Sequence, residues 1–174
     1  MATGVSYNFG GSFNIGKIAV EAVTSFLKRQ HNHLGLASVE GSETYQGQGV
    51  DLLWRIKDRD IKRIVRVEVK ADRYYHTGNL YFETVSNTTK GTQGCFVGSC
   101  ADIYAYFFVG VGVLYWIPLK IAQMWFSEHQ ERFPVRTTST GRNGEVLYRT
   151  EGRLVPRTIL EKEVPGTRVI TIGG

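Results

Sequence analysis

The sequence has only two cysteines, and their spacing excludes two kinds of site. The two cysteines, Cys95 and Cys100, match neither the ligand spacing of a zinc site nor a CxxC redox motif. We therefore expect reduced thiols in or near the core of a cytoplasmic protein. Residues 1–11 are small and polar, without the basic and apolar regions of an export signal.

A long hydrophobic run is also missing. Residues 103–119 carry no charge, but this stretch is shorter than the roughly 20 residues that a membrane-spanning helix needs. Gly110 and Gly112 interrupt a run rich in tyrosine, phenylalanine and valine, which are residues typical of strands. The pattern predicts two buried strands that meet at a glycine-rich turn, and no membrane association.

The length and charge of the chain limit its organisation and its partners. A chain of 174 residues suits one domain with a hydrophobic core. We expect a single domain over residues 1–174, in which residues 134–174 form a C-terminal extension containing several arginines. The net charge of +5 has the sign required for a polyanionic partner.

The hydrophobic periodicity predicts an α/β fold. Apolar residues at three- and four-residue spacing indicate a helix that follows Asn14 and ends near Arg29. A second helix is expected at residues 120–133. Strands are expected at residues 37–45, 50–56, 64–71, 79–85, 102–109 and 113–117, with shorter runs at 146–148 and 168–172. This order predicts a three-layer sandwich with a mixed central sheet flanked by helices.

The most informative segment pairs Asp51 with the alternating run at residues 65–71. In a strand, Val65, Val67 and Val69 occupy one face, so Glu68 and Lys70 point together to the other face. A hairpin with its tip at residues 57–62 brings Asp51 beside Glu68. Asp51 lies within an apolar run, where an unpaired carboxylate is costly.

This arrangement resembles the PD-(D/E)xK nuclease superfamily over roughly residues 14–116. Asp51, Glu68 and Lys70 carry the match, although Val50 stands where the name-giving motif has proline. The resemblance implies a restriction endonuclease-like fold and a bound Mg²⁺, or Mn²⁺, held by Asp51, Glu68 and the backbone carbonyl of Val69. Lys70 would then orient or deprotonate the attacking water and offset charge in the transition state.

Other residues extend the candidate site. Glu40 and Glu83, on neighbouring strands, are candidates for the same acidic cluster. Glu21 on the first helix is a weaker candidate, because a pair with Lys17 at i, i+4 explains it without a metal. Candidate DNA contacts follow the strands, at Arg73, Asn87 and Lys90.

The expected function is therefore a Mg²⁺-dependent endonuclease that hydrolyses DNA phosphodiester bonds. We expect a homo-oligomer, because cutting both strands or a branched junction normally takes two active sites. The sequence does not distinguish a homing or restriction enzyme from a junction-resolving enzyme. One alternative is a catalytically silent nucleic-acid-binding or assembly protein on the same fold, and another is an unrelated α+β domain in which the three residues merely pair.

Overall fold

The computed structural model describes residues 5–142 and 145–172, and its side chains at residues 14–140 and 145–172. The helices are α1 (Phe9–Lys28), α2 (Glu43–Gln46), α3 (Cys95–Gly98), α4 (Leu119–His129) and α5 (Arg157–Glu163). The strands are β1 (Val5–Asn8), β2 (His33–Ser38), β3 (Leu52–Asp58), β4 (Ile61–Asp72), β5 (Asn79–Asn87), β6 (Thr92–Gln93), β7 (Ile103–Phe108), β8 (Val113–Pro118), β9 (Val135–Arg142), β10 (Glu145–Pro156) and β11 (Arg168–Thr171). Two 3₁₀ turns lie at Tyr75–Thr77 and Gln130–Arg132.

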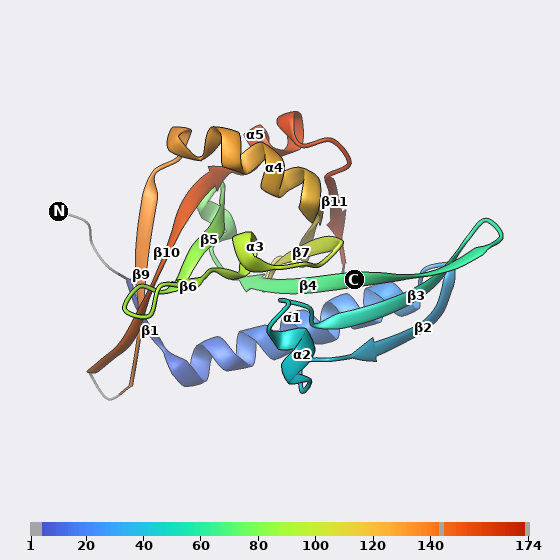
Figure 1. Cartoon of the computed structure of the whole chain (residues 1–174), viewed down its shortest axis with the longest axis horizontal. Coiled ribbons are helices and arrows are strands. Elements are labelled where there is room, and N and C mark those ends of the chain that lie inside the picture. The colour runs from blue at the N-terminus through green and yellow to red at the C-terminus, as the bar shows by residue number, and fades with distance from the viewer. Residues whose placement is uncertain (1–4, 143–144, 173–174) are drawn as a thin grey trace.

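The larger of the two sheets carries the candidate motif. Its strand order is β11-β8-β7-β4-β3-β2, and it is mixed because β4 pairs in parallel with β7 while its other pairs are antiparallel. The β3–β4 hairpin projects beyond the rest of the sheet (Figure 1). The motif strand β4 therefore lies at the centre of the sheet, between β3 and β7.

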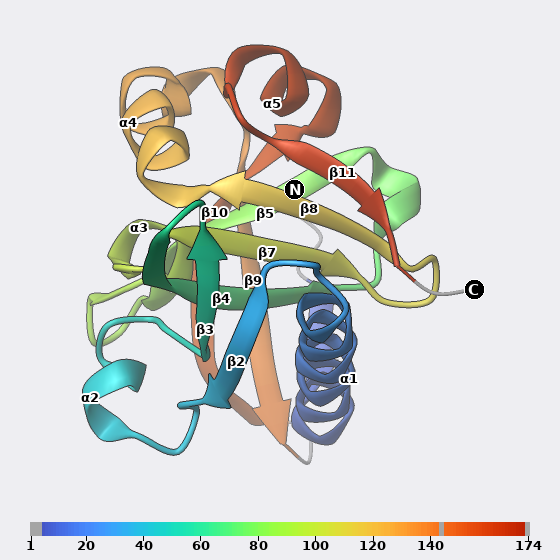
Figure 2. The same cartoon turned by 90° about the vertical axis from the view of Figure 1, so that its right-hand side faces the viewer.

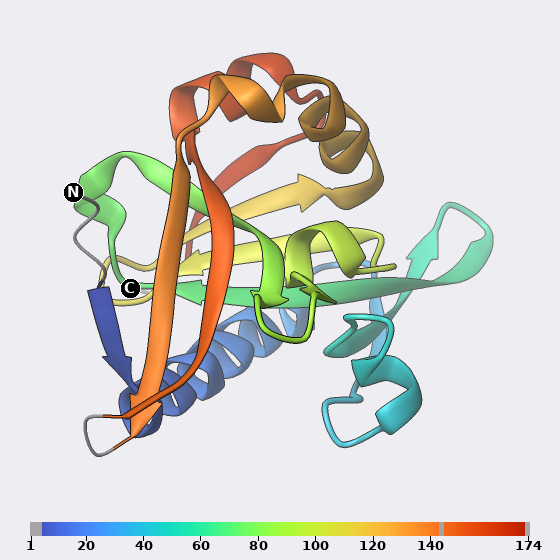
Figure 3. The ribbon, with the colours of Figure 1, turned by 60° about the vertical axis from the view of Figure 1, so that its left-hand side comes forward.

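The smaller sheet has the order β1-β9-β10-β5-β6. Its long strands β9 and β10 form an antiparallel hairpin that runs from the α4 and α5 side of the molecule toward the beginning of α1 (Figure 3). Strand β5 joins this sheet by pairing with β10. The chain thus leaves the larger sheet after β4, contributes β5 and β6 to the smaller one, and returns at β7.

Two hydrophobic clusters hold the layers of the fold together, one on each face of the larger sheet. One cluster lies between α1 and the larger sheet and includes Val23, Leu52 and Val67. The other lies between the two sheets and beneath α4, and includes Phe82 and Tyr104. Helix α1 covers one face of the larger sheet, and the smaller sheet with α3 and α4 covers the other (Figure 2).

The mixed sheet and the general α/β class agree with the sequence prediction, but the second covering layer differs. We expected helices on both faces of the central sheet, whereas much of one face packs against the smaller sheet. The C-terminal region that was expected as an extension supplies β9, β10, α5 and β11, and so takes part in both sheets.

Several element boundaries also differ from the predictions. Helix α1 begins at Phe9 rather than after Asn14. The strand expected at residues 37–45 was wrong, since β2 ends at Ser38 and α2 follows. A turn bond from the Ser42 N–H to the Val39 carbonyl ends the strand, and the bonds from the Gln46 and Gly47 N–H groups to residues 42 and 43 form the helical turn that follows. Among the described residues, no helix is long and apolar enough to cross a membrane.

Candidate functional site

Backbone hydrogen bonds fix Asp51 beside the middle of β4. The Asp51 N–H donates to the Val67 carbonyl at 3.0 Å, and Asp51 Oδ2 accepts from the Val69 N–H at 2.7 Å. These two bonds bracket residue 68 along the strand. The carboxylate of Asp51 is therefore held next to the backbone that carries Glu68.

A tight turn at Gly49 directly precedes Asp51. Gly49 adopts a φ of 61°, and a Cβ at this position would lie 2.8 Å from the Cβ of Ser99. The Ser99 hydroxyl donates to the Gly49 carbonyl at 2.6 Å and accepts from the Ala101 N–H at 3.1 Å. Val50 packs between the two sheets, on the opposite side of the larger sheet from Leu52. The two residues lie on opposite sides because regular strand geometry begins at Leu52.

The predicted alternation of β4 is confirmed. Val65 and Val67 are buried against α1, and Val69 packs at the edge of the same cluster. Glu68 and Lys70 point to the other face, where their neighbours on β7 are Tyr104 and Tyr106. The two candidate side chains consequently lie in the space between the two sheets.

Glu68 is a buried carboxylate without a partner. Only 9% of the residue is exposed, and within the described part of the chain its carboxylate accepts no hydrogen bond and forms no ion pair. Burial and the charge of Asp51 raise the pKa of Glu68 to about 8, although Lys70 opposes the shift. Burial also raises the pKa of Asp51 to about 6, against the Val69 hydrogen bond. Burial is the largest cause of both shifts, so both carboxyl groups are partly removed from water.

Lys70 is held by a carboxylate from the other sheet. Its Nζ lies 3.2 Å from Oε2 of Glu83 on β5, and Glu83 Oε1 accepts a 3.4 Å bond from the Cys95 N–H. Burial lowers the pKa of Lys70, but the charges of Cys95 and Glu83 outweigh it and leave the pKa above its ordinary value. Lys70 therefore stays an ammonium at neutral pH.

The other acidic candidates lie at different distances from this cluster. Glu83 joins it directly, as just described. Glu40 is exposed, but its charge contributes to the raised pKa of Asp51, so it lies at the solvent side of the cluster. Glu21 is exposed on α1, which covers the opposite face of the sheet. Among the described residues, the charge of Glu21 is not one of the causes that shift the pKa of Asp51 or Glu68.

The candidate DNA contacts are more scattered. Arg73 is exposed just after β4, beside Lys70. Asn87 Oδ1 accepts from the N–H groups of Thr89 and Lys90 at 3.0 Å, so this side chain shapes the turn after β5. Lys90 is exposed on that turn. These three residues do not form one patch.

Several C-terminal arginines are engaged in structure rather than free for a ligand. Arg132 makes two hydrogen bonds to Glu163, at 2.8 and 3.0 Å. Arg153 pairs with Glu131 at 3.0 Å, and Arg157 lies 3.8 Å from the centre of the Tyr75 ring. They are therefore poor candidates for a wide basic surface.

The sequence reasoning missed a cavity that adjoins Lys70. It has a volume of about 590 Å³ and is lined on one side by the end of β4 and on the other by residues of β5, β9 and β10, including Arg136 and Tyr148. No pattern in the sequence pointed to these residues, because their proximity to Lys70 depends on how the second sheet packs.

The carboxylates of this site suit a cation that needs few protein ligands. Among residues 5–142 and 145–172, no group of three or more histidine, cysteine, aspartate or glutamate side chains is arranged to hold a metal. Mg²⁺, however, commonly uses one or two carboxylates and keeps several waters. Asp51 and the unpartnered Glu68 supply two such carboxylates, so the residues present fit this ion.

Comparisons with known proteins add no family to this description. The chain matches no protein-family model, no curated protein and no solved structure.

Proposed function

We propose that the chain is a Mg²⁺-dependent endonuclease that hydrolyses DNA phosphodiester bonds, with a site of PD-(D/E)xK type. The observation that carries this proposal is the buried, unpartnered carboxylate of Glu68, placed beside Asp51 and on the same strand face as Lys70. The charge of Asp51 raises the pKa of Glu68, so the two carboxylates repel each other when both are ionised. A divalent cation would remove that cost.

The order of elements supports the same proposal. The chain forms α1 first, then β2, β3 and β4, and later the parallel strand β7. The four strands lie in the larger sheet, and α1 packs on its face. We infer a restriction endonuclease-like core from this order together with the motif. The smaller sheet would then be an addition to that core.

Each residue has a distinct role in this proposal. Asp51 and Glu68 would hold the cation, with the Val69 carbonyl as a further ligand. The cation, when bound, supplies polarisation of the phosphate and a more acidic water. The Lys70 ammonium would stabilise negative charge that develops on the phosphate oxygens. Its pairing with Glu83 favours this electrostatic role over that of a general base.

A nuclease assay tests the proposal directly. Wild-type protein, Asp51→Asn and Lys70→Ala, purified in parallel, are incubated with Mg²⁺ and supercoiled, linear or four-way-junction DNA. We expect cleavage by the wild type that EDTA abolishes, and none by either variant. Equal cleavage by Asp51→Asn would show that the activity comes from elsewhere. Product analysis on the three DNA forms also tests whether a homo-oligomer cuts both strands.

One observation favours a second candidate, a catalytically silent nucleic-acid-binding protein. The ammonium of Lys70 already forms an ion pair with Glu83, so its charge is offset before any phosphate binds. A silent protein need not bind Mg²⁺. Titration calorimetry with Mg²⁺ therefore distinguishes the candidates, because the silent protein would give no binding heat and would bind DNA equally well in EDTA.

A further inference from the structure

The cavity beside Lys70 lies next to the proposed cleavage site but is not part of it. Lys70 and Glu83 contribute to its wall, whereas Asp51 and Glu68 do not. Its volume of about 590 Å³ falls within the roughly 300–1,000 Å³ of typical ligand sites. The lysine that would contact the cleaved phosphate thus also contacts whatever occupies this cavity.

The charges that line the cavity favour an anionic ligand. Its two carboxylates are engaged, since Glu83 binds Lys70 and Asp72 accepts hydrogen bonds from the Tyr106 hydroxyl and the Tyr74 N–H. Arg73 and Arg136 also line the cavity, and neither forms an ion pair with a carboxylate of the described residues. Two arginines without a neutralising partner, next to a lysine, are the kind of lining that contacts phosphates.

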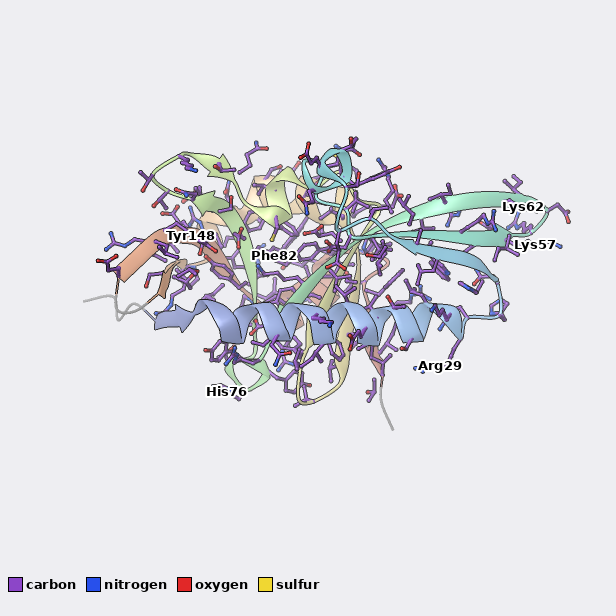
Figure 4. All side chains as sticks on the ribbon, turned by 90° about the horizontal axis from the view of Figure 1, so that it is seen from below. Arg29, Lys57, Lys62, His76, Phe82 and Tyr148 are labelled. Atoms are coloured by element: carbon purple, nitrogen blue, oxygen red, sulfur yellow. The ribbon has the colours of Figure 1, made fainter. Side chains whose placement is uncertain are left out.

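The remaining lining is rich in hydroxyl groups and aromatic rings. Thr138 and Thr150 share a 2.7 Å hydrogen bond across β9 and β10, and Thr140 lies on the same wall. Tyr81 and Tyr148 offer flat apolar rings, of the kind on which bases stack. Figure 4 shows Tyr148 at the end of the molecule away from Lys57 and Lys62, near the N-terminal half of α1.

We propose that this cavity receives one unpaired nucleotide directly adjacent to the cleaved bond. Its phosphate would lie between Lys70 and the arginines, and its base against Tyr148. The inference rests on the proposed nuclease function and names its substrate class, which is DNA with an unpaired or single-stranded nucleotide at the cleavage point. A paired nucleotide would first have to leave the duplex, at a cost of a few kcal/mol.

Fluorescence binding tests this inference without cleavage. Asp51→Asn, whose altered residue does not line the cavity, is titrated with duplexes that contain one 2-aminopurine, either unpaired or opposite thymine. We expect at least tenfold tighter binding of the unpaired form, equivalent to about 1.4 kcal/mol, and a change in 2-aminopurine emission as the base stacks. The same affinity for both duplexes would overturn the inference.

Second-site variants in the Asp51→Asn background locate the effect. Tyr148→Ala should abolish both the preference and the emission change, whereas Tyr148→Phe should keep them because it retains the ring. Arg136→Ala should weaken binding of the unpaired form, and Arg168→Ala is the matched control, since Arg168 is exposed on β11. Melting curves verify that each variant is folded. A preference that survives Tyr148→Ala would place the nucleotide elsewhere.

Failure of this inference can be separated from failure of the proposed function. If the wild type cleaves fully paired DNA as fast as DNA with an unpaired nucleotide, the nuclease proposal stands and the cavity inference falls. If no DNA is cleaved but the Tyr148-dependent preference is present, the cavity binds a nucleotide in a silent protein.

Discussion

The ammonium of Lys70 on β4 lies 3.2 Å from Oε2 of Glu83 on β5, so an ion pair joins the two sheets at the candidate site. Side-chain exposure is 27% for Lys70 and 11% for Glu83, so water screens the pair only in part. The pair both positions the lysine and keeps it charged.

Replacing Glu83 with glutamine should lower activity through Lys70. Without the carboxylate, burial would lower the pKa of Lys70, because the opposing charge of Glu83 is lost. We expect at least a tenfold loss of cleavage at pH 8 and a descending limb of the pH–rate profile that moves to lower pH. Glu21→Gln, an exposed change on α1, is the control. If the cleavage rate fell by the same factor at every pH, and the pH–rate profile did not move, Glu83 would have only a structural role.

The metal-free protein should lose stability as the pH rises. The pKa of Glu68 is about 8 in the folded chain against 4.5 ordinarily, and that of Asp51 is about 6 against 3.8. The folded state thus binds more protons than the unfolded state between these values, and the free energy of unfolding falls as pH rises from about 4 to 8. Below the ordinary pKa values this penalty is absent.

Glu68→Gln provides the variant for that prediction, because a neutral amide does not titrate. Urea unfolding in EDTA should show a smaller loss of stability between pH 5 and pH 8.5 than in the wild type. At pH 8.5 the free energy of unfolding of Glu68→Gln should exceed that of the wild type by at least about 1 kcal/mol. This difference is the equivalent of a pKa shift of less than one unit. Glu128→Gln, exposed on α4, should behave as the wild type. Identical pH slopes for Glu68→Gln and wild type would refute the raised pKa.

Mg²⁺ should raise the melting temperature of the wild type. A ligand that binds only the folded state adds about 2.7 kcal/mol at a hundredfold excess over its Kd, or roughly 5 to 10 °C for a chain of this size. Lys70→Ala should show a similar upward shift relative to its own metal-free form. Asp51→Asn should shift less, because an amide is a poorer ligand for a hard cation. Equal shifts for all three proteins would indicate binding away from Asp51.

Gly94→Ala should disturb the site from a distance. A Cβ at this position would lie 2.4 Å from the backbone carbonyl carbon and oxygen of Glu83, where the Gly94 N–H binds the Thr84 carbonyl at 2.9 Å. Strand β5 would have to move, and we expect destabilisation of about 1–3 kcal/mol, together with reduced cleavage. Gly41→Ala is the control, since nothing lies within 4 Å of its added Cβ. Thermal melts of both variants provide the measurement.

Much of the larger sheet could be predicted from the sequence, because the patterns that indicate its strands lie within short stretches of the chain. The alternation of Val65, Val67 and Val69 with charged residues set the faces of β4, and the uncharged run at residues 103–119 indicated β7 and β8. The proximity of Asp51 to Glu68 followed from the hairpin. The first helix was found from its periodicity, although not its start.

The smaller sheet could not be predicted in the same way. Strand β9 contains three threonines and a single large apolar residue, and the apolar residues of β10 are grouped at 146–148 and 154–155 instead of alternating, so their periodicity is weak. The long partner of β5 is β10, which lies far along the chain, and only tertiary packing brings Glu83 against Lys70. Sequence alone therefore identified Glu83 as a candidate but not the cavity that Arg136 and Tyr148 line.

The late position of β9 and β10 in the chain has a consequence for synthesis. Asp51, Glu68 and Lys70 are translated before residue 71, whereas β5 gains its long neighbour only when β10 is complete at Pro156. At about 5–20 residues per second, the delay is on the order of several seconds. Throughout that interval the nascent chain contains all three motif residues, but the strand that carries the partner of Lys70 is not yet held in place. A translation product that stops before β9 would therefore carry the complete motif without a finished site.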